Sequence, residues 1–141
     1  MRVDKLPEIL PICVIVILLS GCATGSPETI KVALVAPFSG RYREIGYDAI
    51  TATRLALQDF SQSNPETLTV VELVAYDDQG YPEVAVQQAT RITQDPAIKV
   101  VIGHWRDETT VAAASTYEQA HLPLITFAMD ENAAPISAAY N

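Results

Sequence analysis

Residues 30–40 have the sequence IKVALVAPFSG, an almost unbroken run of apolar and β-branched side chains that ends at Ser39-Gly40. A run of this length and composition is typical of a strand buried on both faces, as in a parallel sheet that helices cover. The stretch therefore predicts the first strand of an α/β fold at Ile30–Phe38.

Three more apolar runs follow, and segments with helical periodicity separate them. The further predicted strands are Leu68–Tyr76, Val100–Gly103 and Leu122–Phe127. The predicted helices are Gly46–Ser61, Pro82–Gln94 and Glu108–Ala120, and the tail from Met129 to Asn141 is compatible with the start of a fourth. This alternation predicts a three-layer, Rossmann-like parallel sheet with helices on both faces.

The first 22 residues have the features of an export signal. Arg2 and Lys5 precede an apolar run, Ile9–Leu19, which is about half of the ~20 residues that a membrane-spanning helix needs. The run ends in Leu-Ser-Gly-Cys22, which resembles the bacterial lipobox, where the cysteine thiol takes up a diacylglycerol before cleavage. The alternative is a plain cleaved signal or a short interfacial anchor, with Cys22 incidental.

These features predict three parts: a lipoprotein signal peptide at residues 1–21, a small, polar tether at residues 22–29, and one domain at residues 30–141. Acyl chains on Cys22 would hold the protein at a membrane without spanning it. We therefore expect the protein in the cell envelope, lipid-anchored to the outer face of the cytoplasmic membrane or in the periplasm.

Composition argues against two classes of function. The net charge is −8, with 9 basic and 17 acidic side chains, so a phosphate backbone would be repelled and no nucleic-acid partner is expected. The sequence contains no Ser-His-Asp order, Gly-rich phosphate loop or HExxH motif, so no catalytic residue and no cofactor are expected. Asp77-Asp78 is compatible with a Mg²⁺ site, although turn formation before Pro82 is the simpler interpretation, and no metal is expected.

The order of these segments resembles the leucine/isoleucine/valine-binding protein family, the type I periplasmic receptors of ABC transporters. The resemblance covers Ile30 to about Ala134. The pieces that carry it are IKVALVAPFSG, a helix start containing Gly46, YDDQGYPEVAVQQATRI, VVIGH, a helix containing Ala-Ser-Thr-Tyr, and HLPLITFA.

The resemblance implies the N-terminal lobe of a two-lobed clamp that closes on an amino acid or a related small solute. The chain ends soon after its fourth predicted strand, so we expect an incomplete lobe. The implied function is that of an extracytoplasmic solute-binding lipoprotein, or a fragment of one, that delivers its ligand to an ABC permease. The alternative is a membrane-tethered interaction or regulatory module that uses the same fold without transport.

Ligands of such sheets bind beyond the carboxyl ends of the strands, and here that rule selects Phe38–Tyr42, Asp77–Tyr81, His104–Asp107 and Ala128–Asp130. In relatives, the loop after the VIGH strand commonly carries a hydroxyl that takes the ligand's α-carboxylate. Asp107 stands at that position here, and a carboxylate cannot donate to a carboxylate. Arg106 is a candidate replacement, because its guanidinium can bind a carboxylate with two hydrogen bonds. Asp107 is also suited to capping the helix that follows, which we consider the better interpretation.

A second departure lies after the fourth predicted strand, where Asp130 stands at another hydroxyl position of the family. Two acidic replacements favour a cationic ligand or one without a carboxylate, and loss of binding in a decayed half-receptor would explain them too. Trp105 is suited either to stack on a ligand or to cover the sheet edge, and we expect His104 to be structural. The candidate ligand-binding residues are Ser39, Tyr42, Trp105, Arg106, Asp107, Ala128 and Asp130.

Overall fold

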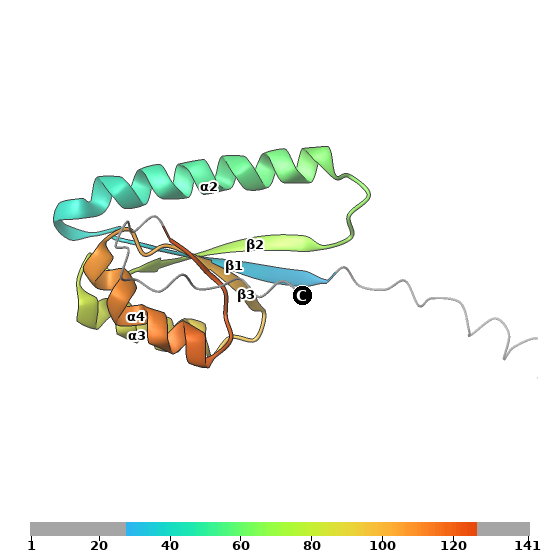
Figure 1. The fold of residues 1–141 in the computed structure, drawn as a ribbon. Helices are drawn as coiled ribbons and strands as arrows, with labels where there is room; N and C mark the ends of the chain where they lie inside the picture. The colour runs from blue at the N-terminus through green and yellow to red at the C-terminus, as the bar shows by residue number, and fades with distance from the viewer. Residues whose placement is uncertain (1–27, 127–141) are drawn as a thin grey trace, which may run out of the picture.

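The computed structural model describes residues 28–126 (Figure 1). The predicted signal peptide, Cys22, most of the predicted tether, Ala128, Asp130 and the tail lie outside the described residues. The elements, in chain order, are β1 (Thr29–Ala36), a 3-10 turn η1 (Gly40–Tyr42), α2 (Arg43–Ser63), β2 (Val70–Asp77), α3 (Pro82–Ile92), β3 (Ile98–Ile102), α4 (Asp107–Gln119) and β4 (Leu124–Ile125).

All four strands are parallel and lie in the order β2-β1-β3-β4, so the most apolar strand of the sequence, β1, is central. Its residues pair with β2 without interruption, from Thr29 opposite Val70 to Ala36 opposite Asp77. Helix α2 lies over one face of the sheet, and α3 and α4 lie over the other (Figure 1). The predicted three-layer α/β fold is confirmed.

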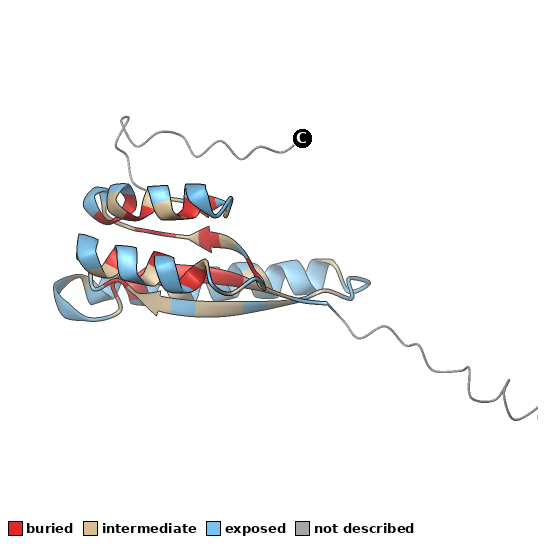
Figure 2. Cartoon of the chain, turned by 90° about the horizontal axis from the view of Figure 1, so that it is seen from below, coloured by how far each residue is buried: buried red, intermediate tan, exposed pale blue. Residues whose placement is uncertain are grey.

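The core lies between the sheet and the pair of helices α3 and α4 (Figure 2). Alanines at the contact allow these elements to approach closely, because each contributes only one methyl group to the interface. The buried residues of this cluster are Ala33 and Val35 of β1, Ala85, Ala89 and Ile92 of α3, Ile98 and Val101 of β3, Ala113 and Tyr117 of α4, and Leu124 of β4.

Helix α2 begins earlier than its sequence predicts, and fewer of its apolar side chains are buried. It starts at Arg43, directly after η1, so Gly46 lies inside the helix. The helix passes close to the residue after β1 at this point, because a Cβ added at Gly46 would be 2.4 Å from the Pro37 carbonyl oxygen. Leu55 and Phe60 are 58% and 48% exposed, so α2 contacts the sheet mainly through its first turns. In residues 28–126, no helix combines the length and the apolar character needed to cross a bilayer.

Strand β4 is shorter than predicted because backbone N–H groups just before it form hydrogen bonds with the last turn of α4. His121 has φ of 53°, the left-handed conformation that often ends a helix. Its N–H donates to the Glu118 carbonyl at 3.0 Å, and the Leu122 N–H donates to the Tyr117 carbonyl at 3.0 Å. Because this bond turns Leu122 back toward the helix, the strand begins only at Leu124.

Candidate functional site

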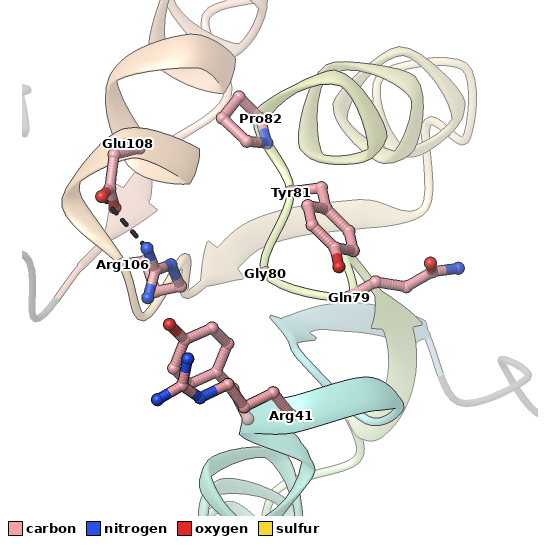
Figure 3. Close-up of a pocket in the computed structure, with 8 residues that line it drawn as sticks. Arg41, Gln79, Gly80, Tyr81, Pro82, Arg106 and Glu108 are labelled. Atoms are coloured by element: carbon pink, nitrogen blue, oxygen red, sulfur yellow. Dashed lines mark hydrogen bonds and ion pairs between the residues drawn. The ribbon is translucent and has the colours of Figure 1, made fainter.

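The loops that follow β1, β2 and β3 meet at one edge of the sheet, because parallel strands all end there. Between these loops lies a pocket of about 320 Å³ (Figure 3). Each of the three loops contributes to its wall. The lining residues are Arg41, Tyr42, Gln79, Gly80, Tyr81, Pro82, Arg106 and Glu108.

Arg106 is the most constrained charge in the pocket. Its guanidinium carbon lies 4.3 Å from the centroid of the Tyr42 ring, within cation–π distance. One terminal nitrogen donates to the Glu108 carboxylate at 3.0 Å (Figure 3), and 27% of the side chain remains exposed. Its Nε is buried and has no acceptor among the described residues. The guanidinium is therefore fixed in place and still has donors to offer.

Gly80 allows Tyr42 and Arg106 to lie against the turn after β2. Its φ is +74°, a conformation that side chains rarely adopt. A Cβ added at Gly80 would lie 3.0 Å from the Tyr42 ring and 3.2 Å from Cδ of Arg106. A larger residue here would push both side chains out of their present positions.

Two adjacent carboxylates shape this turn. The Asp77 carboxylate accepts hydrogen bonds from the Gln79 N–H at 2.9 Å and the Phe38 N–H at 2.8 Å, and Asp78 accepts one from the Gly80 N–H at 2.9 Å. Each aspartate thus bonds the N–H two residues ahead, which confirms the turn-forming interpretation. Within residues 28–126, no group of three or more His, Cys, Asp or Glu side chains is placed to hold a metal ion.

The Asp77 carboxylate connects the loop after β1 to the end of β2, and its pKa reflects these bonds. Burial raises the pKa of Asp77. Hydrogen bonds from the Ser39 hydroxyl and from the backbone N–H groups of Gln79, Phe38 and Ser39 lower it by more, so the net pKa lies below the usual value. The folded state therefore holds Asp77 in its ionised form.

Acidification is expected to lower stability through Asp77. Because its pKa is lower in the folded than in the unfolded chain, its contribution is fully present above about pH 4 and is lost as the pH falls through the folded-state pKa. Replacing Asp77 by asparagine should flatten the decline in melting temperature below about pH 4. The matched change Asp48→Asn, at an exposed position of α2, should leave it intact. Equal slopes for wild type and Asp77→Asn would contradict this assignment.

Behind the pocket wall lies a fully buried chain of three polar side chains. Asp78 Oδ2 is 2.7 Å from His104 Nδ1, and His104 Nε2 is 3.2 Å from the Tyr117 hydroxyl. Burial, and then the charge of Asp78, raise the pKa of Tyr117, so the phenol keeps its proton and is able to donate to Nε2. That arrangement leaves the imidazole's own proton on Nδ1, where it donates to Asp78.

Threonine hydroxyls fix the loop between β3 and α4. The His104 carbonyl accepts from Thr110 at 3.1 Å and from Thr126 at 3.0 Å. The Arg106 carbonyl accepts from Thr109 at 2.8 Å and lies 2.9 Å from the Thr110 hydroxyl, whose one proton is shared between the His104 and Arg106 carbonyls. The backbone on both sides of Trp105 is therefore held, which fixes the point from which the Arg106 side chain extends.

The structure brings two of the predicted site residues, Tyr42 and Arg106, into the same pocket. Ser39, Trp105 and Asp107 do not line it. Ala128 and Asp130 lie outside the described residues. Their contact with a ligand remains a prediction.

The prediction that Asp107 is the N-cap of the third predicted helix is wrong. Arg106, whose φ of −121° and ψ of 142° are extended, holds the N-cap position, and Asp107 is the first helical residue. The carboxylate lies one residue too late to cap but still within the first turn. There it favours the helix through its dipole.

The sequence did not single out Arg41, Gln79, Gly80, Tyr81, Pro82 or Glu108. Gln79, Gly80 and Tyr81 lie in a stretch that the sheet-edge rule does select, between a strand and a proline-initiated helix. The positive φ of 56° at Gln79 and the tight packing of Gly80 depend on neighbours that are distant in sequence.

A family model described as "Periplasmic binding protein" matches residues 29–140. The Leu/Ile/Val-binding protein of Escherichia coli (strain K12) is 32% identical over 115 residues, which cover 77% of this chain and 31% of that protein. The chain thus spans about a third of the length of the curated relatives it matches.

Solved structures agree with this similarity. The branched-chain amino acid transporter substrate-binding protein of Streptococcus pneumoniae, solved with isoleucine, aligns with a TM-score of 0.69 over 75% of this chain and 31% of its own. At 21% identity, that likeness is one of fold. An ABC transporter substrate-binding protein of Desulfitobacterium hafniense, solved with Leu, has a TM-score of 0.59 and 27% identity over 70% of this chain and 28% of its own.

Proposed function

Because the chain belongs to the periplasmic binding protein family, we propose that it serves as the solute-binding component, or part of one, of an ABC importer for amino acids or related small solutes. One observation carries this proposal: a preformed pocket at the carboxyl edge of the sheet holds Tyr42 and Arg106 together. In α/β sheets this edge is where ligands bind. The partner that receives the solute would be an ABC permease.

The residues of the pocket suit binding rather than bond cleavage. Arg106 offers a planar pair of donors to a carboxylate, and Tyr42 supports the guanidinium from one side. Tyr81, which is 55% exposed, offers an aromatic surface to the body of a small solute. The work proposed for this site is to hold a solute and release it, which needs no cofactor and no catalytic group.

Amino-acid-type solutes are expected to raise the melting temperature of the full chain, because a ligand that binds only the folded state adds to its stability. At a concentration of about 100 times Kd the gain is about 2.7 kcal/mol, enough to move the midpoint by several degrees. The measurement is a thermal melt of the full chain in detergent against a panel of α-amino acids, with sugars as controls. A panel that leaves the midpoint unchanged would argue against solute binding.

We also propose that Cys22 carries the lipid anchor and that the protein lies in the cell envelope. The support is the apolar run that ends in Leu-Ser-Gly-Cys22. Expressed in bacteria, the wild-type chain is expected to incorporate labelled palmitate and to sediment with membranes. Cys22→Ser should abolish the labelling, whereas the matched change Cys13→Ser, within the signal, should preserve it. Equal labelling of wild type and Cys22→Ser would refute the anchor.

The alternative function is a membrane-tethered interaction module. The observation that favours it is the exposure of large apolar side chains on described surfaces, among them Leu55 of α2, Leu68 before β2 and Ile125 of β4. This alternative predicts no shift of the melting midpoint with any solute. The same melt therefore separates the two functions.

A further inference from the structure

The pocket carries more positive than negative charge. Two arginines line it, and Glu108 is the one carboxylate among the lining residues. The guanidinium carbons of Arg106 and Arg41 lie 4.3 Å and 5.8 Å from the centroid of the Tyr42 ring. Arg106 is paired with Glu108, so the lining has an excess of one positive charge, and in a protein of net charge −8 this local excess favours a negatively charged solute.

Three helix N-termini also meet at this pocket. Tyr42, Tyr81 and Arg106 are the N-cap residues of α2, α3 and α4, and all three line the pocket. None of these side chains makes a capping hydrogen bond to its helix. The first turns of these helices already carry Glu44, Glu83, Asp107 and Glu108, whose carboxylates offset part of the partial positive charge at the N-termini. The preference for an anion therefore depends on the side chains of Arg41 and Arg106.

A neutral amino acid does not neutralise the excess positive charge of the pocket. It is a zwitterion, so the ammonium group that enters with its carboxylate restores the positive charge that the carboxylate removes. A solute with a second carboxylate carries a net charge of −1 and would neutralise the excess. The pocket volume of about 320 Å³ suits a small molecule of this kind.

We propose that this pocket selects acidic solutes, amino acids or small organic acids with a carboxylate beyond the one that every amino acid carries, and that Arg106 and Arg41 are the residues that determine this preference. The inference rests on the proposed solute-binding function and adds the class of solute. This preference for a negatively charged solute is opposite to the preference for a cationic ligand that Asp107 and Asp130 led us to expect.

The two arginines differ in how they serve a second carboxylate. Arg106 is already held by Tyr42, Glu108 and the packing against Gly80, so it loses little freedom when an anion binds. Arg41 is exposed at the start of the 3-10 turn and is free to adjust to the solute. A fixed donor and an adjustable one allow solutes of slightly different length to be bound.

The test compares glutamate with glutamine, which have the same shape and differ in charge, and adds leucine and lysine. Binding of each to the full chain in detergent is measured by isothermal titration calorimetry. Glutamate is expected to bind about tenfold or more tighter than glutamine, the range that a charged hydrogen bond provides. Arg106→Gln should reduce glutamate affinity about ten- to hundredfold and change glutamine little.

Arg41→Gln provides a second variant at an exposed position, where folding is not at risk, and it should weaken glutamate binding in the same direction. Arg54→Gln, at an exposed position within α2, is the matched control and should change nothing. Tighter binding of leucine or lysine than of glutamate overturns the acidic preference and leaves the proposed function standing. Failure of all four solutes to bind overturns both. Equal loss for glutamate and glutamine in both arginine variants also overturns the selectivity.

Discussion

Replacing Gly103 by alanine is expected to prevent the chain from folding. Gly103 follows β3 with φ of +125°, and a Cβ there would lie 2.0 Å from the carbonyl oxygen of Val35 and 3.0 Å from its carbonyl carbon. Val35 belongs to the central strand and is completely buried, so the backbone cannot move away. A clash with fixed backbone, added to an unfavourable φ, falls among the changes that cost more than ~4 kcal/mol. That is comparable to the whole stability of a small domain.

Two other glycines allow the effect of the backbone clash to be separated from the effect of the positive φ. Gly40 has φ of +73° with nothing within 4 Å of an added Cβ, so Gly40→Ala should cost only the strain of the left-handed backbone, about 1–2 kcal/mol. Gly46 is crowded by the Pro37 carbonyl, at 2.4 Å, without a positive φ. Far-UV circular dichroism and urea unfolding of the three variants should rank Gly103→Ala as the most damaging. A Gly103→Ala protein that unfolds near the wild-type midpoint would contradict the prediction.

The second large effect is expected at Asp78. Its carboxylate accepts from His104 Nδ1 at 2.7 Å and from the Gly80 N–H at 2.9 Å, and the residue is completely buried. Asp78→Ala leaves both donors inside the protein with no acceptor. Each buried donor left without an acceptor costs about 1–3 kcal/mol, so the two together are expected to cost about 2–6 kcal/mol. Urea unfolding should show the midpoint falling accordingly.

Two milder variants test this explanation. Asp78→Asn keeps an oxygen for the Gly80 N–H but places an amide against His104, so its cost should lie between those of wild type and Asp78→Ala. Tyr117→Phe removes only the hydroxyl at the far end of the chain, and its expected cost is about 1 kcal/mol. Tyr117→Phe keeps the ring and its packing, so a loss as large as that of Asp78→Ala would contradict the assignment of the main cost to the buried carboxylate.

The fold follows from local patterns to a large extent. The apolar run at Ile30–Phe38 predicted the central strand, and Pro82 marked the start of its helix correctly. Boundaries were predicted less well where distant neighbours decide them. Gly46 was predicted to begin a helix and instead lies inside one that continues from the 3-10 turn before it. Its glycine is explained by the Pro37 carbonyl, which leaves no room for a side chain.

The site was predictable in its position but only partly in its residues. The rule that ligands bind beyond the strand ends led to the loops of Tyr42 and Arg106, and the family resemblance led to Arg106 itself. The structure places both residues in one pocket. The same rule did not show that Glu108 would bind Arg106, or that three uncapped helices would begin there. Side-chain pairing and helix starts depend on the exact loop geometry. A strand-and-helix pattern carries little of that information.

The pair Asp77-Asp78 has a consequence for insertions and deletions. The two carboxylates are adjacent in sequence, yet one fastens the loop after β1 through Phe38 and the other fastens the loop after β3 through His104. Side chains alternate between the faces of a strand, so removing or adding one residue within β2 would turn each carboxylate toward the wrong loop. Substitutions in β2 are therefore expected to be tolerated far better than any change in its length. Chain-length variation in this region should be confined to the segment between α2 and β2.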